Sequence, residues 1–77
     1  MFTICFGQKH IMEFGKRLKE LRKLKKISQM ELALQTGISQ SAIAKWELDK
    51  TEPTASALIA LSRFFDESVD YLLGLTD

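Results

Sequence analysis

The apolar residues of this chain recur every three or four positions, which is the spacing of one face of an α-helix. The first such stripe consists of Ile11, Phe14, Leu18 and Leu21, and the lysines and arginines around it fall mostly on the other side. The cationic last turn suits the negative end of a helix dipole. This segment is therefore predicted to form a helix from about residue 13 to residue 25.

Two short helices are predicted next, on either side of Gly37. Ser28 begins an S-x-x-E sequence, in which the serine hydroxyl accepts a hydrogen bond from a backbone amide of the first turn. Gly37 ends this helix, because glycine adopts the left-handed conformation of a helix end without a steric penalty. Ser39 is the N-cap of the next helix, over residues 40–48. Together these segments form a helix-turn-helix.

Two more helices complete the pattern. Thr54 is the N-cap of the fourth, and Ser68 is the N-cap of a fifth over residues 69–73, which stops at Gly74. The buried face of the fourth helix is predicted to consist of Leu58, Leu61 and Phe65. The body of the chain shows no alternation of apolar and polar residues, so the fold class predicted is all-α, with five helices in one small domain.

Composition then excludes several classes of protein. The single cysteine, Cys5, cannot form an intramolecular disulfide, and with the single histidine, His10, it leaves too few ligands for a structural zinc site. No apolar run approaches the roughly 20 residues of a membrane span, and the first residues lack the basic start of an export signal. We therefore expect a cytoplasmic protein without metal or cofactor.

Charge is distributed unevenly along the chain. Residues 9–50 hold ten lysines and arginines against five acidic residues, whereas residues 51–77 hold one arginine against five acidic residues, and the net charge is only +1. This asymmetry of +5 against −4 suits a protein with one face that meets a polyanion. A solvated helix surface explains the same charges equally well.

The helix over residues 40–48 divides into two sides on a helical wheel. One side carries amide, hydroxyl, methyl and ammonium groups from Gln40, Ser41, Ala44 and Lys45, with Leu48 at its end. The other side carries Ile43 and Trp46, which suit a core. Base edges in the DNA major groove present donors, acceptors and the thymine methyl, so the first side suits DNA recognition. Gln29, at the N-terminus of the preceding helix, is a candidate phosphate contact, although most such helix ends simply face water.

These segments together resemble the phage-repressor and Cro-like (XRE-type) helix-turn-helix family. The resemblance covers residues 13–74 and rests on Arg22, S-Q-x-E-L-A at 28–33, G-I-S-Q-S-x-I at 37–43, W-E at 46–47, Pro53 and S-V-D-Y-L-L-G at 68–74. It implies a compact five-helix, lambda-repressor-like fold. The DNA-binding residues that it implies are Gln29, Ser39, Gln40, Ser41, Ala44, Lys45, Lys50 and Thr51. It also implies a structural ion pair between Arg22 and Glu47.

The sequence departs from the family at a few positions. Asp49 stands where the family usually has glycine, and Leu34 and Phe64 replace small or polar residues, which leaves apolar surface for a partner. Residues 1–12 lie outside the resemblance and are treated as an extension of the domain formed by residues 13–77. Phe2, Ile4 and Phe6 alternate with other residues, which is a strand-like pattern. Because a single strand does not persist without a partner, the extension is expected to be disordered or strand-like.

The leading functional hypothesis is a transcriptional regulator that binds double-stranded DNA sequence-specifically. In particular, we expect a repressor that acts as a homodimer on a near-palindromic operator. The alternative is a protein-interaction module, such as an antitoxin-like subunit that uses the same fold to bind another protein. An enzyme is not expected, because the only histidine lies in the extension and no Gly-rich phosphate loop or G-x-S-x-G motif occurs.

Overall fold

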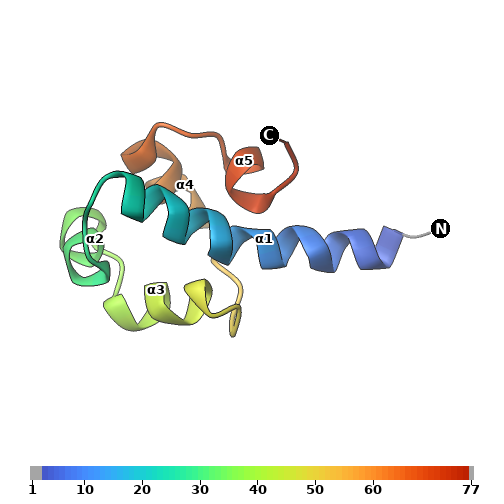
Figure 1. Cartoon of the computed structure of the whole chain (residues 1–77), viewed down its shortest axis with the longest axis horizontal. Helices are drawn as coiled ribbons and strands as arrows, with labels where there is room; N and C mark the ends of the chain where they lie inside the picture. Colours follow the sequence, from blue (N-terminus) through green and yellow to red (C-terminus); the bar gives the residue numbers. More distant parts are fainter. Residues whose placement is uncertain (1–2, 77) are drawn as a thin grey trace.

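Five α-helices make up the regular structure of this protein. The computed structural model describes the backbone of residues 3–76 and the side chains of residues 13–76. The helices are α1 (Thr3–Leu24), α2 (Gln29–Thr36), α3 (Gln40–Glu47), α4 (Ala55–Phe65) and α5 (Val69–Leu73). No strand occurs among residues 3–76, so the all-α, five-helix architecture predicted from the sequence is confirmed (Figure 1).

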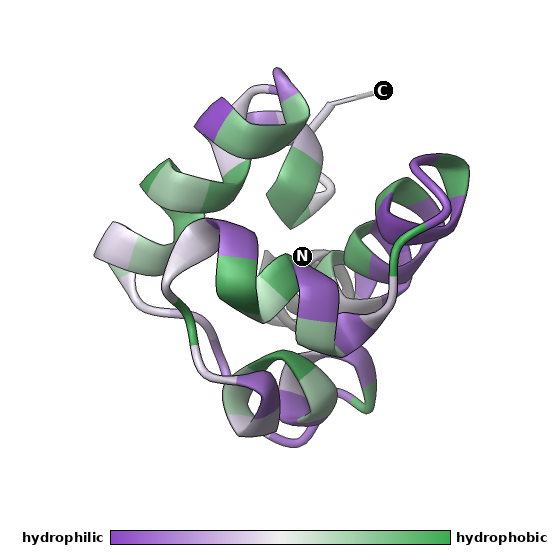
Figure 2. Cartoon of the chain, turned by 90° about the vertical axis from the view of Figure 1, so that its left-hand side faces the viewer, coloured by the Kyte–Doolittle hydropathy of each residue, from purple (hydrophilic) through white to green (hydrophobic). Residues whose placement is uncertain are grey.

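The long helix α1 is the central element of the fold. It contacts α3 on one side and α5 on the other, while α2 packs against α3 and α4 (Figure 1). Each helix carries both hydrophobic and hydrophilic stretches, as helices around a common core do (Figure 2). Every helix contributes to that core, whose most deeply buried large side chains are Phe14, Leu18, Leu32, Ile43, Leu61 and Leu72. Burial of each such side chain stabilises the fold by roughly 1.5–3 kcal/mol.

The N-caps predicted for α2 to α5 are confirmed, whereas α1 begins at Thr3 rather than at about residue 13. In α2 to α5 the N-cap hydroxyl accepts a hydrogen bond, at 3.0–3.2 Å, from the backbone N–H three residues later. The four N-caps are Ser28, Ser39, Thr54 and Ser68. Gly37 and Gly74 end α2 and α5 in the left-handed conformation, with φ of 77° and 81°. Local sequence signals therefore fix where each of these helices begins.

The expectation for the N-terminal extension is wrong over the residues that the structure describes. Residues 3–12 form the first part of α1, and no break separates them from residues 13–24 (Figure 1). A helix that already exists is extended at the cost of one residue at a time, without a new nucleation step. A strand over the same residues would need a partner strand. Met1 and Phe2 lie outside the described residues.

The buried face of α4 differs by one position from the prediction. Ala57, Leu61 and Phe65 are buried, whereas Leu58 is only half-buried and packs against the edge of the core. The three buried residues are spaced by four, so they form one row along the helix. The prediction was therefore wrong at Leu58, since the row that faces the core includes the small Ala57 instead.

Arg17 joins α1 to the C-terminal end of the fold. Its Nη1 donates hydrogen bonds to the carbonyl oxygens of Tyr71, at 2.9 Å, and Thr76, at 2.7 Å. The guanidinium also lies 4.4 Å from the centre of the Tyr71 ring, and its Nε lies 3.6 Å from a carboxylate oxygen of Glu13. A cation at the C-terminus of a helix interacts favourably with its free carbonyl groups. Arg17 thus fixes the five-residue α5 to α1.

Candidate nucleic-acid interface

The helix α3 is held in place from one side only. Ile43 is fully buried and Trp46 is 5% exposed, and the Trp46 ring meets Phe14 of α1 edge-on at 5.8 Å between ring centres. Ser39 caps the N-terminus of α3 by accepting a hydrogen bond from the Ala42 N–H at 3.1 Å. These contacts fix the helix so that its other side is turned away from the core.

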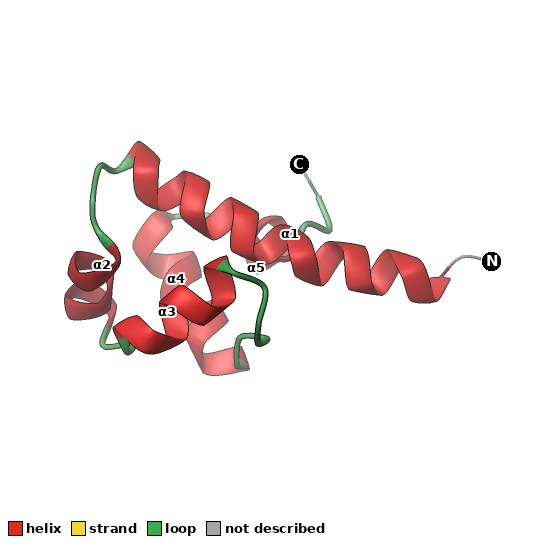
Figure 3. Cartoon of the chain, turned by 60° about the horizontal axis from the view of Figure 1, so that its bottom comes forward, coloured by secondary structure: helices red, strands yellow, loops and turns green. Residues whose placement is uncertain are grey.

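The outward side of α3 carries the residues that were predicted to read DNA. Gln40, Ser41 and Lys45 are exposed and Ala44 is half-buried, so their polar groups and the alanine methyl are available to a ligand. Figure 3, which brings α3 to the front, shows that no other helix covers this side. An α-helix fits the major groove of B-DNA, so this side of α3 has the shape and the chemical groups of a base-reading surface.

A hydrogen-bonded network ties α3 to α1 and to the start of α2. The Arg22 guanidinium binds Glu47 in a bidentate pair, with Nε to Oε2 at 2.8 Å and Nη2 to Oε1 at 3.0 Å. Arg22 Nη1 also donates to the Ile27 carbonyl at 3.0 Å. The hydrogen bond to Glu47 raises the pKa of Arg22 above its ordinary value, partial burial opposes this, and the nearby carboxylate charge adds to the increase. The structure thus places in contact the two residues that the resemblance paired.

Gln29 belongs to this network, which the sequence did not reveal. Its Nε2 donates a hydrogen bond to Glu47 Oε1 at 3.0 Å. The acidic partner of Gln29 is therefore a residue of α3 and not Glu31, the acidic residue in the first turn of α2. A primary amide has two N–H donors, so the second N–H of Gln29 is still available to donate to a phosphate oxygen. The carboxylate of Glu47 therefore orients Gln29 at the N-terminus of α2.

The turn after α3 presents Lys50 and Thr51, which are both exposed. Its backbone is fixed by two hydrogen bonds that close the helix, from Asp49 N–H to the Trp46 carbonyl at 3.0 Å and from Lys50 N–H to the Lys45 carbonyl at 2.9 Å. Asp49 adopts the left-handed conformation with φ of 59°, so aspartate takes the role for which the family usually uses glycine. These bonds hold Lys50 next to the end of α3.

Gly15 of α1 allows α1 to pass close to the end of α3, a role that was not predicted from the sequence. A Cβ atom at this position would lie 2.2 Å from the Trp46 carbonyl oxygen and 2.6 Å from Asp49 Oδ1. The backbone of α1 therefore passes directly against the end of α3, and the Asp49 carboxylate is turned toward α1. A glycine inside a predicted helix was the one available signal, because such a glycine often has a packing reason.

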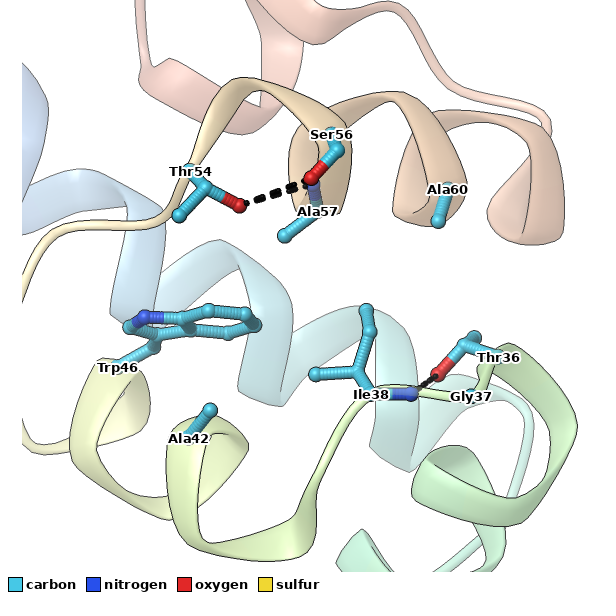
Figure 4. A pocket seen from close by; sticks show the side chains of 9 residues that line it. All are labelled: Thr36, Gly37, Ile38, Ala42, Trp46, Thr54, Ser56, Ala57 and Ala60. Atoms are coloured by element: carbon cyan, nitrogen blue, oxygen red, sulfur yellow. Dashed lines mark hydrogen bonds between the residues drawn. The ribbon is translucent and has the colours of Figure 1, made fainter.

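An open groove of about 390 Å³ lies beside α3, on the side that faces α4 (Figure 4). The residues that line it are Thr36, Gly37, Ile38, Ala42, Trp46, Thr54, Ser56, Ala57 and Ala60. None of the predicted DNA-binding residues lines this groove, so it is separate from the outward side of α3. Among the side chains of residues 13–76 we find no cluster suited to a metal ion. No helix in the part of the chain that the structure describes is long and apolar enough to cross a membrane.

Comparison of the amino-acid sequence with known proteins identifies the family to which this chain is similar. Residues 18–72 match a protein family described as helix-turn-helix. The uncharacterized HTH-type transcriptional regulator YobD of Bacillus subtilis (strain 168) is 42% identical over 64 residues, which are 83% of this chain and 57% of YobD. No solved structure matches the chain.

Two further relatives carry functional names. The HTH-type transcriptional activator BcrR of Enterococcus faecalis is 42% identical over 63 residues, or 82% of this chain and 31% of BcrR. Repressor protein C2 of Salmonella phage P22 is 44% identical over 59 residues, or 77% of this chain and 27% of that repressor. The chain thus spans between 27% and 57% of the length of these three relatives. Because the family match includes the whole helix-turn-helix and most of the chain, the protein belongs to the phage-repressor and Cro-like (XRE-type) helix-turn-helix family.

Proposed function

We propose that this protein is a sequence-specific transcriptional regulator that binds double-stranded DNA with α3 in the major groove. The observation that carries the proposal is the division of α3, whose Ile43 and Trp46 are buried while Gln40, Ser41 and Lys45 are exposed on the opposite side. A glutamine amide pairs with adenine through two hydrogen bonds, and a lysine ammonium donates to guanine or to phosphate. The names of the relatives as transcriptional regulators and repressors support the proposal.

Phosphate contacts would set the position of α3 in the groove. Gln29 at the N-terminus of α2 and the pair Lys50 and Thr51 after α3 lie on either side of the base-reading residues along the chain. Backbone N–H groups at the start of a helix add a partial positive charge that favours a phosphate. Such contacts hold the register of the protein on the duplex but carry no direct sequence information.

We further propose that the regulator is a repressor that acts as a homodimer. A recognition helix of eight residues reads only a few base pairs, so useful specificity needs two copies on a near-palindromic operator. The half-sites would lie about 10 base pairs apart, or a multiple of this distance. A dimer that occupies a promoter blocks access of the polymerase.

Selection of bound duplexes from a random pool tests the proposal directly. We expect enrichment of one sequence with two related half-sites. On that sequence Gln40→Ala should cost about 1–3 kcal/mol of binding free energy, with a much smaller loss on random DNA. Lys50→Ala should weaken binding to all sequences alike and reduce the dependence of affinity on salt. Equal losses on specific and random DNA would refute Gln40 as a base-reading residue.

A protein-interaction module is the second candidate function. It is favoured by Leu34, which is 77% exposed on α2 although most surface positions of the fold are polar. Titration of DNA binding against salt separates the two candidates. A steep loss of affinity with rising salt supports the regulator, whereas no binding to any duplex at low salt supports the interaction module.

A further inference from the structure

A large apolar side chain stands exposed at the end of α3. Leu48 is the C-terminal cap of this helix and is 66% exposed. Residues three and four apart share a helix face, so Leu48 follows Lys45 and Ala44 along the outward side. The hydrogen bonds that close the helix around Asp49 and Lys50 fix the backbone on both sides of Leu48, so its exposure is a property of the folded helix end.

The charges around Leu48 favour an anionic partner. Lys45 and Lys50 are both exposed, and their backbones are joined by the 2.9 Å hydrogen bond. The two nearest acidic residues are turned elsewhere, because Glu47 binds Arg22 and Gln29, and the carboxylate of Asp49 lies against Gly15. Glu52 is exposed farther along the turn. An exposed apolar side chain with exposed lysines before and after it in the chain suits a polyanion that also offers apolar contacts.

We infer that Leu48 is a specificity-determining residue that contacts the C5-methyl group of a thymine. This inference rests on the proposed function, because it places Leu48 at the edge of the base pairs that α3 reads. The thymine methyl is the apolar group that base edges present in the major groove, and leucine has no polar atom with which to read any other group there. Ala44, one turn earlier, would contact a different base pair.

Replacement of thymine by deoxyuridine tests the inference, because this change removes only the C5-methyl group. Each thymine of the selected half-site is replaced singly, and affinities are measured for the wild-type chain and for Leu48→Ala. We expect one position at which deoxyuridine weakens wild-type binding about four-fold, which is the effect of one buried methyl group. Leu48→Ala should lose at least as much on the thymine duplex and respond little to deoxyuridine at that position.

Two control variants make the result specific. Leu34→Ala removes a leucine of similar exposure from α2 and should leave affinity and the response to deoxyuridine unchanged. Leu48→Met keeps an apolar side chain of similar size and should retain most of the response. The inference is overturned if Leu48→Ala binds as tightly as wild type, or if it loses the same factor on the thymine and deoxyuridine duplexes at every position. Failure of the wild-type chain to bind any duplex would instead refute the proposed function itself.

Discussion

Replacement of Gly15 by alanine tests the close approach of α1 to α3. In an ordinary helix interior this change stabilises a protein by about 0.5–1 kcal/mol. Here the new Cβ would lie 2.2 Å from the Trp46 carbonyl oxygen, and Cβ atoms essentially never come closer than 3.0 Å to an atom of a residue elsewhere in the chain. The Asp49 carboxylate can rotate away from its 2.6 Å contact, but the carbonyl is backbone and accepts the Asp49 N–H.

The two helices must therefore separate, which weakens the packing of Phe14 on Trp46. Overpacking of this kind costs about 1–3 kcal/mol, and more where a backbone atom cannot move aside. After the gain in helix propensity, we expect a net loss of about 1–2 kcal/mol of unfolding free energy. Thermal unfolding followed by circular dichroism should show a melting temperature lowered by about 5–15 °C, since 1 kcal/mol corresponds to roughly 4–8 °C in a domain of this size.

Lys16→Ala is the matched control, because Lys16 is exposed and adjacent to Gly15 on α1. It should change the melting temperature little. The folded fraction of Gly15→Ala should also bind DNA more weakly, because α3 is displaced from the position that its core contacts define. A melting temperature for Gly15→Ala equal to or above that of the wild type would refute the reasoning.

The remaining predictions concern the polar contacts between helices. Glu47→Gln removes the charge that Arg22 binds and should lower the unfolding free energy, measured with urea, by about 1.5–3 kcal/mol; a loss no larger than that of an exposed Glu20→Gln would contradict it. Because the pKa of Arg22 is raised in the folded protein, Arg22 stabilises the fold at every pH below the ordinary pKa of arginine, and this stabilisation is lost only as pH rises through the raised pKa. The contribution of Arg22 to stability, measured as its effect on the urea midpoint, should therefore not change between about pH 6 and pH 9. Arg17→Met should free the end of α5, and hydrogen exchange of the Leu72 amide should accelerate well beyond that of the α3 amides. Equal acceleration in both helices would indicate global unfolding instead.

The features that could be predicted from the sequence are those that depend on residues close together along the chain. A serine or threonine cap acts on an amide three residues away, and Gly37 acts on its own turn, so such signals locate the helices without knowledge of the fold. The buried faces of α1 and α3 were also predictable from spacing, as Leu18 and Ile43 show.

The contacts that hold the candidate site together depend on residues far apart in the chain. Gln29 and Glu47 are 18 positions apart, and Arg17 reaches the Tyr71 carbonyl across 54 positions. The role of Gly15 depends on where the end of α3 lies in space. Apart from the presence of a glycine inside a predicted helix, these contacts have no local signature, because many folds could bring such residues together. The resemblance to the family supplied the Arg22–Glu47 pair, which spacing alone does not indicate.

In the described part of the chain, three residues other than glycine adopt the left-handed conformation at helix ends, namely Lys26, Asp49 and Asp66, with φ between 57° and 60°. A side chain makes this conformation unfavourable by roughly 1–2 kcal/mol at each position, although aspartate tolerates it better than most residues. The domain thus folds with a conformational cost at three of its turns that glycine would largely remove. Its thermal stability can therefore be raised at positions 26 and 66, outside the side of α3 that is proposed to bind DNA, which makes this small scaffold suitable for redesign of its binding helix.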